Sequence, residues 1–262
     1  MNISSKELIS KMKATLNNIG YDLSKAIIEL GQVSRSERRD RGESFSIEEH
    51  LKGLILAMLS NQRPWGPIVE NMEKITEIFY GFQIEKIKQA DKSSLATQLK
   101  DIKCGNRSID KQMESLDYNI RIFEQIEVVY GSLDQYVVND TPDNIAWELG
   151  QGRKYKLKQM GYTLALEYLR NVGVKAIKPD LHIRRIIGDE RLNLYSGYPS
   201  EIETVKIMGT IAEESGVNLT YLDNLMWLYC AVDYANICGS DPKCNLCELQ
   251  QSCNMGVSKQ AV

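Results

Sequence analysis

The sequence predicts an all-α protein, because helical periodicity recurs along the chain and convincing alternating strands are missing. Apolar residues return every three or four positions in several segments, and residues typical of helix caps flank these segments. The chain has 262 residues, of which 43% are hydrophobic, so it can form one large domain or two lobes without stabilisation by disulfides or metal ions.

The first strong helical pattern covers residues 44–62, where Ser46 and Glu49 have the spacing of a capping box. The same periodicity continues in residues 71–82 and 115–133. Residues 34–44, SRSERRDRGES, have no apolar periodicity and are expected to form a solvated linker, with contact to phosphates as the alternative.

Three further helices are expected in the second half of the chain. In residues 139–152 Asp140 or Thr141 can cap a helix, Pro142 suits its first turn and Gly150 its exit. The segments 162–173 and 218–238 complete the set, listed here with their sequences: YTLALEYLRNVG and NLTYLDNLMWLYCAVDYANIC.

The hydropathy of the sequence indicates where in the cell the protein is located, whereas its net charge says little about its binding partners. The formal net charge is −3, from 32 basic and 35 acidic side chains, and this balance neither indicates nor excludes nucleic-acid binding. No stretch approaches the roughly 18 apolar residues of a membrane span, and the first 20 residues lack a signal-peptide core. We therefore expect a cytoplasmic protein with no membrane partner, associated with the nucleoid if its source is prokaryotic.

Four of the six cysteines lie within sixteen residues near the C-terminus: Cys238, Cys244, Cys247 and Cys253. A single Cys-x2-Cys pair between two outlying cysteines is closer to [4Fe-4S] ligation than to a structural zinc site, which usually joins two separated pairs. The spacing predicts a [4Fe-4S] cluster, with zinc as the alternative. The two isolated cysteines, Cys104 and Cys230, are expected to be ordinary core or surface thiols.

The segment KPDLHIRR, residues 178–185, places Asp180 directly after a proline and before an apolar run. Asp180 can act as a helix N-cap, or as a carboxylate positioned for chemistry. Upstream, Gly161 can form a tight turn at a helix N-terminus, where backbone N–H groups suit a phosphate and Lys156 and Lys158 add positive charge.

Together these segments resemble the helix-hairpin-helix DNA glycosylase superfamily, and within it the endonuclease III branch that has a C-terminal iron-sulfur loop. The resemblance runs from about Ser46 to Cys253, and residues 187–218 match only loosely. Its segments, in order, are LILAMLSNQ as an early helix, LKQMGYTLALEYLRNVG as the hairpin and its second helix, KPDLHIRR as the aspartate segment, and the cysteine loop.

The resemblance implies roles for individual residues. Asp180 would be the catalytic aspartate, and the four clustered cysteines would be the cluster ligands. Gln62 would occupy the base stack after the target base has flipped out. The remaining implied residues are Lys158, Gly161, His182 and Arg185 at the DNA, and Asn61, Trp65 and Tyr162 at the base pocket.

The chain also departs from the family pattern. The first cysteine spacing is five residues where the family usually has six, and KQMG stands where a Gly-x-Gly hairpin is common. The position at which bifunctional members keep a nucleophilic lysine falls on Tyr162 or Thr163, and neither can form a Schiff base. A second hairpin-like segment, LGQGRK, would supply Lys154 as the nucleophile but lies about eight residues too far from Asp180.

We therefore expect a monomeric, two-lobed enzyme that acts on double-stranded DNA. Residues 46–173 would form a helical barrel lobe and residues 1–45 with 174–262 a cluster lobe, with DNA in the cleft between them. A monofunctional glycosylase that leaves an abasic site is favoured over a bifunctional glycosylase and lyase using Lys154, and over a non-catalytic iron-sulfur DNA-binding protein. The base removed stays open, and the unmatched segments could serve an unusual substrate such as modified viral DNA.

Overall fold

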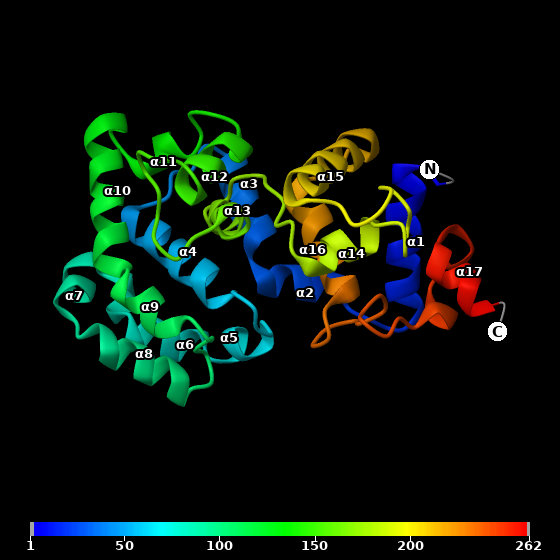
Figure 1. Ribbon diagram of the computed structural model, residues 1–262, viewed down its shortest axis with the longest axis horizontal. Helices are drawn as coiled ribbons and strands as arrows, with labels where there is room; N and C mark the ends of the chain where they lie inside the picture. Colours follow the sequence, from blue (N-terminus) through cyan, green and yellow to red (C-terminus); the bar gives the residue numbers. More distant parts are fainter. Residues whose placement is uncertain (1–2, 261–262) are drawn as a thin grey trace. The chain divides into compact units, whose positions relative to one another are not determined.

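Every regular element in the computed structural model, which describes residues 3–260, is helical (Figure 1). The all-α prediction is therefore confirmed over this range. The chain divides into two compact units: unit 1 combines the described residues up to Val33 with those from Ile177 onward, and unit 2 is Ser34–Ala176. Sequence patterns had suggested lobe boundaries at 46 and 173. None of the helices described is long and apolar enough to cross a membrane.

Unit 2 is built around α13, which packs against α12 and α4 (Figure 1). Its buried Tyr168 ring lies 5.7 Å from the ring of Phe123 on α10, in the middle of an apolar core. The helices of this unit are α4 (Ile47–Leu59), α5 (Gly66–Glu70), α6 (Met72–Ile78), η1 (Tyr80–Phe82), α7 (Ile84–Gln89), α8 (Lys92–Asp101), α9 (Ile109–Glu114), α10 (Leu116–Tyr130), α11 (Leu133–Tyr136), α12 (Pro142–Gly150) and α13 (Tyr162–Asn171).

Two of the predicted helix starts in unit 2 are confirmed. Ser46 accepts a hydrogen bond from the Glu49 amide, and the Glu49 carboxylate accepts one from the Ser46 amide, which completes the capping box of α4. Thr141 caps α12 and Pro142 occupies its first position. Both signals involve residues at most three positions apart, so they are readable from the sequence alone.

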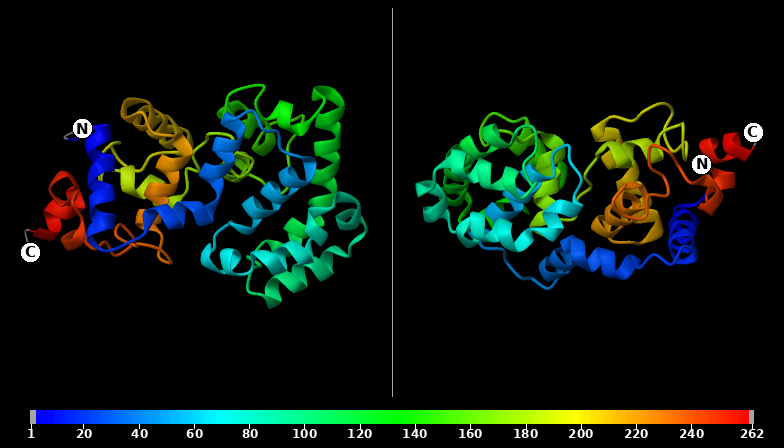
Figure 2. Two further views of the ribbon diagram at one scale, coloured as in Figure 1. Left: turned by 180° about the vertical axis from the view of Figure 1, so that it is seen from behind. Right: turned by 90° about the horizontal axis from the view of Figure 1, so that it is seen from below.

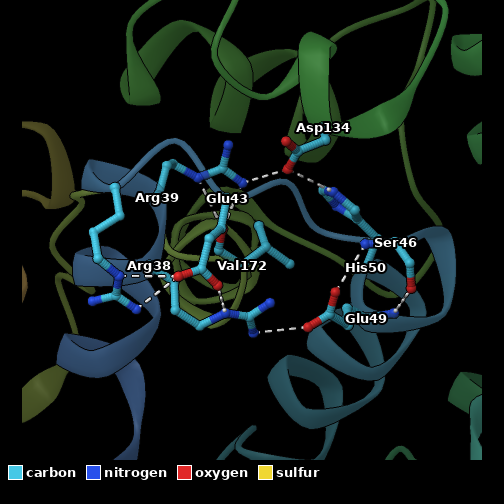
Figure 3. Close-up of polar contacts among 9 residues, drawn as sticks. Arg38, Arg39, Glu43, Ser46, Glu49, His50, Asp134 and Val172 are labelled. Carbon is cyan, nitrogen blue, oxygen red and sulfur yellow. Dashed lines mark hydrogen bonds and ion pairs between the residues drawn. The ribbon is translucent and has the colours of Figure 1, made fainter.

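The prediction of a linker at residues 34–44 is wrong for most of that segment, because Gln32–Asp40 forms the helix α3. Long-range ionic contacts replace the missing apolar face (Figure 3). Arg39 donates to Asp134 at 2.5 Å and to the Val172 carbonyl at 2.7 Å, and Arg38 donates to Glu49 at 2.9 Å. Asp134 and Val172 lie far along the chain from α3, so local periodicity could not reveal these contacts.

Unit 1 has a separate core formed by α1, α14, α15 and α16. The C-terminal cysteine segment, residues 238–253, lies beside α1 in each view of Figures 1 and 2. Within it, the Glu248 amide donates a hydrogen bond to the Thr15 hydroxyl of α1 at 2.9 Å. The helices of this unit are α1 (Ser5–Asn18), α2 (Leu23–Leu30), α14 (Leu181–Ile187), α15 (Glu201–Ser215), α16 (Leu219–Cys230), η2 (Cys244–Leu246), η3 (Gln250–Ser252) and α17 (Asn254–Gln260).

The helix expected over residues 218–238 ends early, at Cys230. The amides of Ile237 and Cys238 both donate to the carbonyl of Tyr229, so the chain turns back on the end of α16 instead of extending it. This reversal brings Cys238 against the helix from which the cysteine segment starts.

Candidate functional site

Asp180 is the N-cap of α14, as its position after Pro179 predicted. Its Oδ1 accepts hydrogen bonds from the amides of His182 at 2.8 Å and Ile183 at 3.2 Å. Its Oδ2 accepts none from residues 3–260, and the side chain is half-buried. The amide of Lys178 donates to the buried carboxylate of Asp223 on α16 at 2.9 Å, which anchors the segment that leads to Asp180. One carboxylate oxygen is thus held by the helix while the other stays available.

The side chains of His182 and Arg185 lie behind this cap within unit 1. The Arg185 guanidinium lies 3.3 Å from His182 Nδ1 and donates to the carbonyl of Cys238 at 3.3 Å. Burial lowers the pKa of His182, and the nearby Arg185 lowers it further, although Asp180 opposes both effects. The α14 helix is therefore linked through Arg185 to the backbone of the cysteine segment.

The hairpin of unit 2 closes where the end of α12 meets the start of α13. A methyl group at position 150 would lie 2.7 Å from both the carbonyl carbon of Gly161 and the amide nitrogen of Tyr162, so only glycine fits at Gly150. Gly161 is the N-cap of α13 and supplies no side-chain cap, and space next to its Cα is open. An anion can approach the first turn of a helix at such a position.

Residues 151–160 form a loop between these two glycines, and Lys158 and Lys154 lie on it. The buried side chain of Asn119 binds both the amide and the carbonyl of Lys158, at 2.8 and 3.1 Å, and the Lys158 ammonium lies 4.4 Å from the centre of the Tyr118 ring. Lys154 is not at a helix N-terminus. Its ammonium lies over the Tyr155 ring, at 4.6 Å from the ring centre.

Asn61, Gln62 and Trp65 share the short loop between α4 and α5. Gln62 is exposed and has a left-handed backbone, with φ of 51°, while Asn61 and Trp65 are half-buried. Non-glycine residues adopt this conformation rarely, and they keep it where surrounding contacts enforce it. The loop therefore presents Gln62 in a defined, strained conformation.

The four clustered cysteines all belong to unit 1, and none of the six cysteines, all of which lie within the described residues, is in a disulfide. Cys247 Sγ lies 3.0 Å from the Tyr229 hydroxyl. The neighbouring Cys230, together with the charges of Arg191 and Arg185, lowers the pKa of Cys238 to about 7 despite its burial. Over residues 3–260 no three His, Cys, Asp or Glu side chains converge closely enough to hold one metal ion. Each thiolate of a cubane binds a different iron, so its ligands need not converge on one point.

Two arginines beside these cysteines, one buried and one half-buried, have buried N–H groups without hydrogen-bond partners in the described chain. They are Arg191, through Nε and Nη1, and Arg185, through Nε. Arg191 is only 4% exposed, and a buried guanidinium is stable only when a negative charge or acceptors compensate it. A group held by four thiolates carries net negative charge, so the residues present fit a thiolate-ligated cluster in both donor type and charge.

The predicted site residues fall into four groups, and each group lies within one unit. Unit 2 holds the loop with Gln62 and, separately, the hairpin with Gly161. Unit 1 holds Asp180 with its neighbours and the cysteine segment. Several residues that position these groups had not been predicted from the sequence, because each hydrogen-bonds to a partner distant along the chain: Arg63, Asn119 and Asp223.

The fold described above is similar to those of solved DNA glycosylases. A Methanocaldococcus jannaschii 8-oxoguanine glycosylase/lyase, in complex with a 15mer DNA containing 8-oxoguanine, matches 85% of this chain and 95% of its own, with a TM-score of 0.59 and 22% identity. The Thermotoga maritima 8-oxoguanine DNA glycosylase covers 86% and 96%, with a TM-score of 0.57 and 19% identity.

An endonuclease III trapped as a covalent intermediate with DNA also matches, over 93% of this chain and 98% of that one, with a TM-score of 0.54 and 18% identity. No protein-family model matches the sequence, and a search of curated proteins finds no relative. The chain therefore has an all-helical fold similar to that of the helix-hairpin-helix DNA glycosylases, and at these identities the similarity concerns the fold.

Proposed function

We propose that this protein is a DNA glycosylase that flips a damaged, mismatched or modified base out of double-stranded DNA and hydrolyses its N-glycosidic bond. The observation that carries the proposal is Asp180, which caps α14 with one carboxylate oxygen and leaves the other available, in a chain with a glycosylase-like fold. The two 8-oxoguanine glycosylases among the similar structures make 8-oxoguanine the first substrate to test.

The chemistry follows from what a carboxylate can do at the sugar. As the bond from C1′ to the base breaks, its electron pair leaves with the base and positive charge develops on the sugar. The free oxygen of Asp180 stabilises that charge and accepts a proton from the water whose oxygen bonds to C1′. The two amide hydrogen bonds to Oδ1 keep the carboxylate oriented throughout.

Unit 2 supplies the DNA-binding residues of the proposal. The first turn of α13 at Gly161 and the ammonium of Lys158 bind backbone phosphates. Gln62 fills the space that the flipped base leaves in the stack, while Asn61, Trp65 and Tyr162 contact the base itself. His182 and Arg185 act indirectly, since their contacts within unit 1 support the turn that carries Asp180.

The proposed enzyme is monofunctional. Tyr162 begins α13 at the position where bifunctional relatives of the family are expected to keep a lysine, and its phenol cannot form a Schiff base. The alternative nucleophile, Lys154, lies on the preceding loop. The reaction then ends at an abasic site in an unbroken strand.

We assign a [4Fe-4S] cluster to Cys238, Cys244, Cys247 and Cys253, with zinc as the alternative. The buried N–H groups of Arg191 and Arg185 support a negatively charged group at this place. Such a cluster would tie the C-terminal segment to the end of α16, and no step of base release needs it. We infer a monomer that acts on double-stranded DNA.

The test is base release by wild type and by Asp180→Asn. Duplexes that each carry one altered base are treated with the protein and then with alkali, which cuts the DNA strand at abasic sites. The first duplex carries 8-oxoguanine. The others carry uracil or thymine opposite guanine, adenine opposite 8-oxoguanine, alkylated purines or modified cytosines. Asparagine keeps a capping oxygen, so stability and DNA binding should persist while base release falls at least about a hundredfold.

Asp91→Asn is the control, because Asp91 also caps a helix, α8, through two backbone amides, although one amide binds each of its carboxylate oxygens. This control should leave base release unchanged. Full activity of Asp180→Asn would exclude the proposed role of the carboxylate. If wild type binds DNA but releases no base from any duplex, the protein is instead a non-catalytic DNA-binding protein.

A further inference from the structure

Two loops of unit 2 are joined by hydrogen bonds, and each presents an exposed residue with a left-handed backbone. The first loop, residues 60–65, connects α4 to α5 and carries Gln62, with φ of 51°. The second, residues 102–108, connects α8 to α9 and carries Lys103, with φ of 55°. Non-glycine residues keep this backbone conformation only where surrounding contacts hold it.

Arg63, the residue after Gln62, makes the central contact. Its Nη1 donates to the carbonyl of Gly105 at 2.6 Å, and its Nη2 donates to the carbonyl of Lys103. The planar guanidinium presents these donors in a fixed fork, so it joins two carbonyl groups of the second loop at once. The ammonium of a lysine is a single compact centre and does not reproduce this geometry.

Side chains from the second loop and from α9 hold both ends of the first loop. Asn106 Nδ2 and Gln112 Nε2 donate to the carbonyl of Met58, at the end of α4, at 2.9 and 3.1 Å. The Cys104 thiol donates to the carbonyl of Pro67 at 3.2 Å. Burial raises the pKa of Cys104, which keeps the thiol protonated as a donor. The loop is thus fixed at its start, middle and end.

We propose that Arg63 is a positioning residue for Gln62: by binding the backbone of the second loop, it preforms residues 60–65 in the conformation in which Gln62 enters the DNA stack. This inference rests on the proposed function, which gives Gln62 its place in the stack. A binding loop that is ordered before DNA arrives loses less conformational freedom on binding. Contacts that enforce a strained backbone are expected where a side chain has to be presented in one direction.

The first experiment measures the free protein and needs no DNA. Hydrogen exchange of the peptide covering residues 60–66 is compared between wild type, Arg63→Lys and Arg107→Lys. Arg107 is an exposed arginine on the second loop with no hydrogen bond or ion pair to the described chain, so its substitution matches the chemical change without touching the contact. Exchange should become faster in Arg63→Lys and stay unchanged in Arg107→Lys.

The second experiment measures discrimination. The affinity for a duplex with one tetrahydrofuran abasic analogue is divided by the affinity for the undamaged duplex, for wild type, Arg63→Lys, Gln62→Ala and the double variant. Arg63→Lys keeps the charge and should lower this ratio about tenfold, as expected when hydrogen bonds of a charged donor are lost. In the Gln62→Ala background the same substitution should have almost no effect, because the two residues act through one contact.

The outcomes separate the inference from the proposed function. Equal effects of Arg63→Lys with and without Gln62 would overturn the positioning role, as would unchanged exchange of residues 60–66. If wild type does not prefer the abasic duplex and releases no base, the proposed function fails and the role of Gln62 fails with it. The exchange comparison would then still show whether Arg63 orders the loop.

Discussion

Lys154 is the amine that the sequence offers as an alternative nucleophile, and its surroundings argue against that role. The neighbouring Tyr155, over whose ring the Lys154 ammonium lies, raises the pKa of that ammonium, so less of the neutral amine is present near neutral pH. Schiff-base lysines require the opposite shift. The backbone amide of Lys154 also donates to the Glu148 carboxylate at 2.9 Å, which fixes the loop away from a helix start.

Borohydride trapping tests this conclusion. Wild type incubated with a cleavable duplex and borohydride should give no covalent protein-DNA complex, and Lys154→Ala should release base at the wild-type rate. Lys156→Ala, a change of a neighbouring lysine on the same loop, controls for lost phosphate contacts. A trapped complex that disappears only in Lys154→Ala would show that the enzyme is bifunctional.

His50 provides a second residue-scale prediction, on stability. Its Nδ1 lies 2.6 Å from the Tyr168 hydroxyl. Its Nε2 lies 3.4 Å from Asp134, as Figure 3 shows. Burial lowers the pKa of His50, more than Asp134 raises it. For Asp134, burial acts to raise the pKa, but the neighbouring His50 and the hydrogen bond from Arg39 outweigh burial and lower the pKa to about 2.

Both folded-state pKa values lie below the unfolded ones, so the unfolded chain binds more protons and stability rises with pH. The urea midpoint of unit 2 should therefore fall as the pH drops below about 6.5, where the unfolded histidine becomes charged, and fall again between about pH 4 and 2. His50→Gln should remove the first decrease and keep the second. An identical pH profile in this variant would assign the first decrease to other groups.

At the scale of elements, α3 and the end of α13 form a contact that depends on one glycine. Gly173 has a left-handed φ of 77°, and a methyl group there would lie 2.5 Å from the Arg35 carbonyl oxygen. The same region is held by the two hydrogen bonds from Arg39 to Val172 and by the ion pair of Lys175 with Asp40 at 2.7 Å. Close backbone approach, together with these polar contacts, keeps α3 in place.

Gly173→Ala should destabilise unit 2 by about 2 kcal/mol or more, because it adds a backbone clash to the cost of a left-handed alanine. Gly42→Ala is the control, since Gly42 has φ of 81° but open space around it. This control should cost only about 1 kcal/mol. Chemical unfolding measures the free energy of unfolding of both variants. Equal decreases in the two variants would mean that α3 can move away from the added methyl group without cost.

At the scale of the whole molecule, the cysteine segment links distant parts of unit 1. It is hydrogen-bonded to α1 through Thr15, to α16 through Tyr229 and to residues 189–191 through Asn254, which donates to the Asp189 carbonyl at 2.7 Å. A metal group held by this segment would therefore stabilise the first and last parts of the chain together.

Protein purified without oxygen should be brown and contain about four irons per chain. Cys244→Ser should lose iron and lower the melting temperature of unit 1 before base release is affected, while Cys104→Ser, a change of a cysteine in unit 2, should retain the iron. Metal analysis and visible absorbance report on both variants. Colourless protein with one zinc per chain would replace the cluster assignment with zinc.

The sequence by itself determined the helical class, the positions of several helices such as α4, α10 and α13, and the caps at Ser46, Thr141 and Asp180. These features depend on residues within about one helical turn of each other, so their signals are contiguous in the sequence. It also singled out the four clustered cysteines and Gln62, whose residue types and spacing suggested roles that remain predictions.

Only the tertiary structure decided the contacts between segments far apart in the chain. The helix α3 exists because Arg39 reaches Asp134 and Val172, and the Gln62 loop is held because Arg63 binds carbonyl groups some forty residues away. Such contacts produce no local periodicity in the sequence. The residues next to an arginine in the sequence do not reveal whether its side chain binds a distant partner or lies in solvent. Their partners become identifiable only when packing of the apolar faces has brought the segments together.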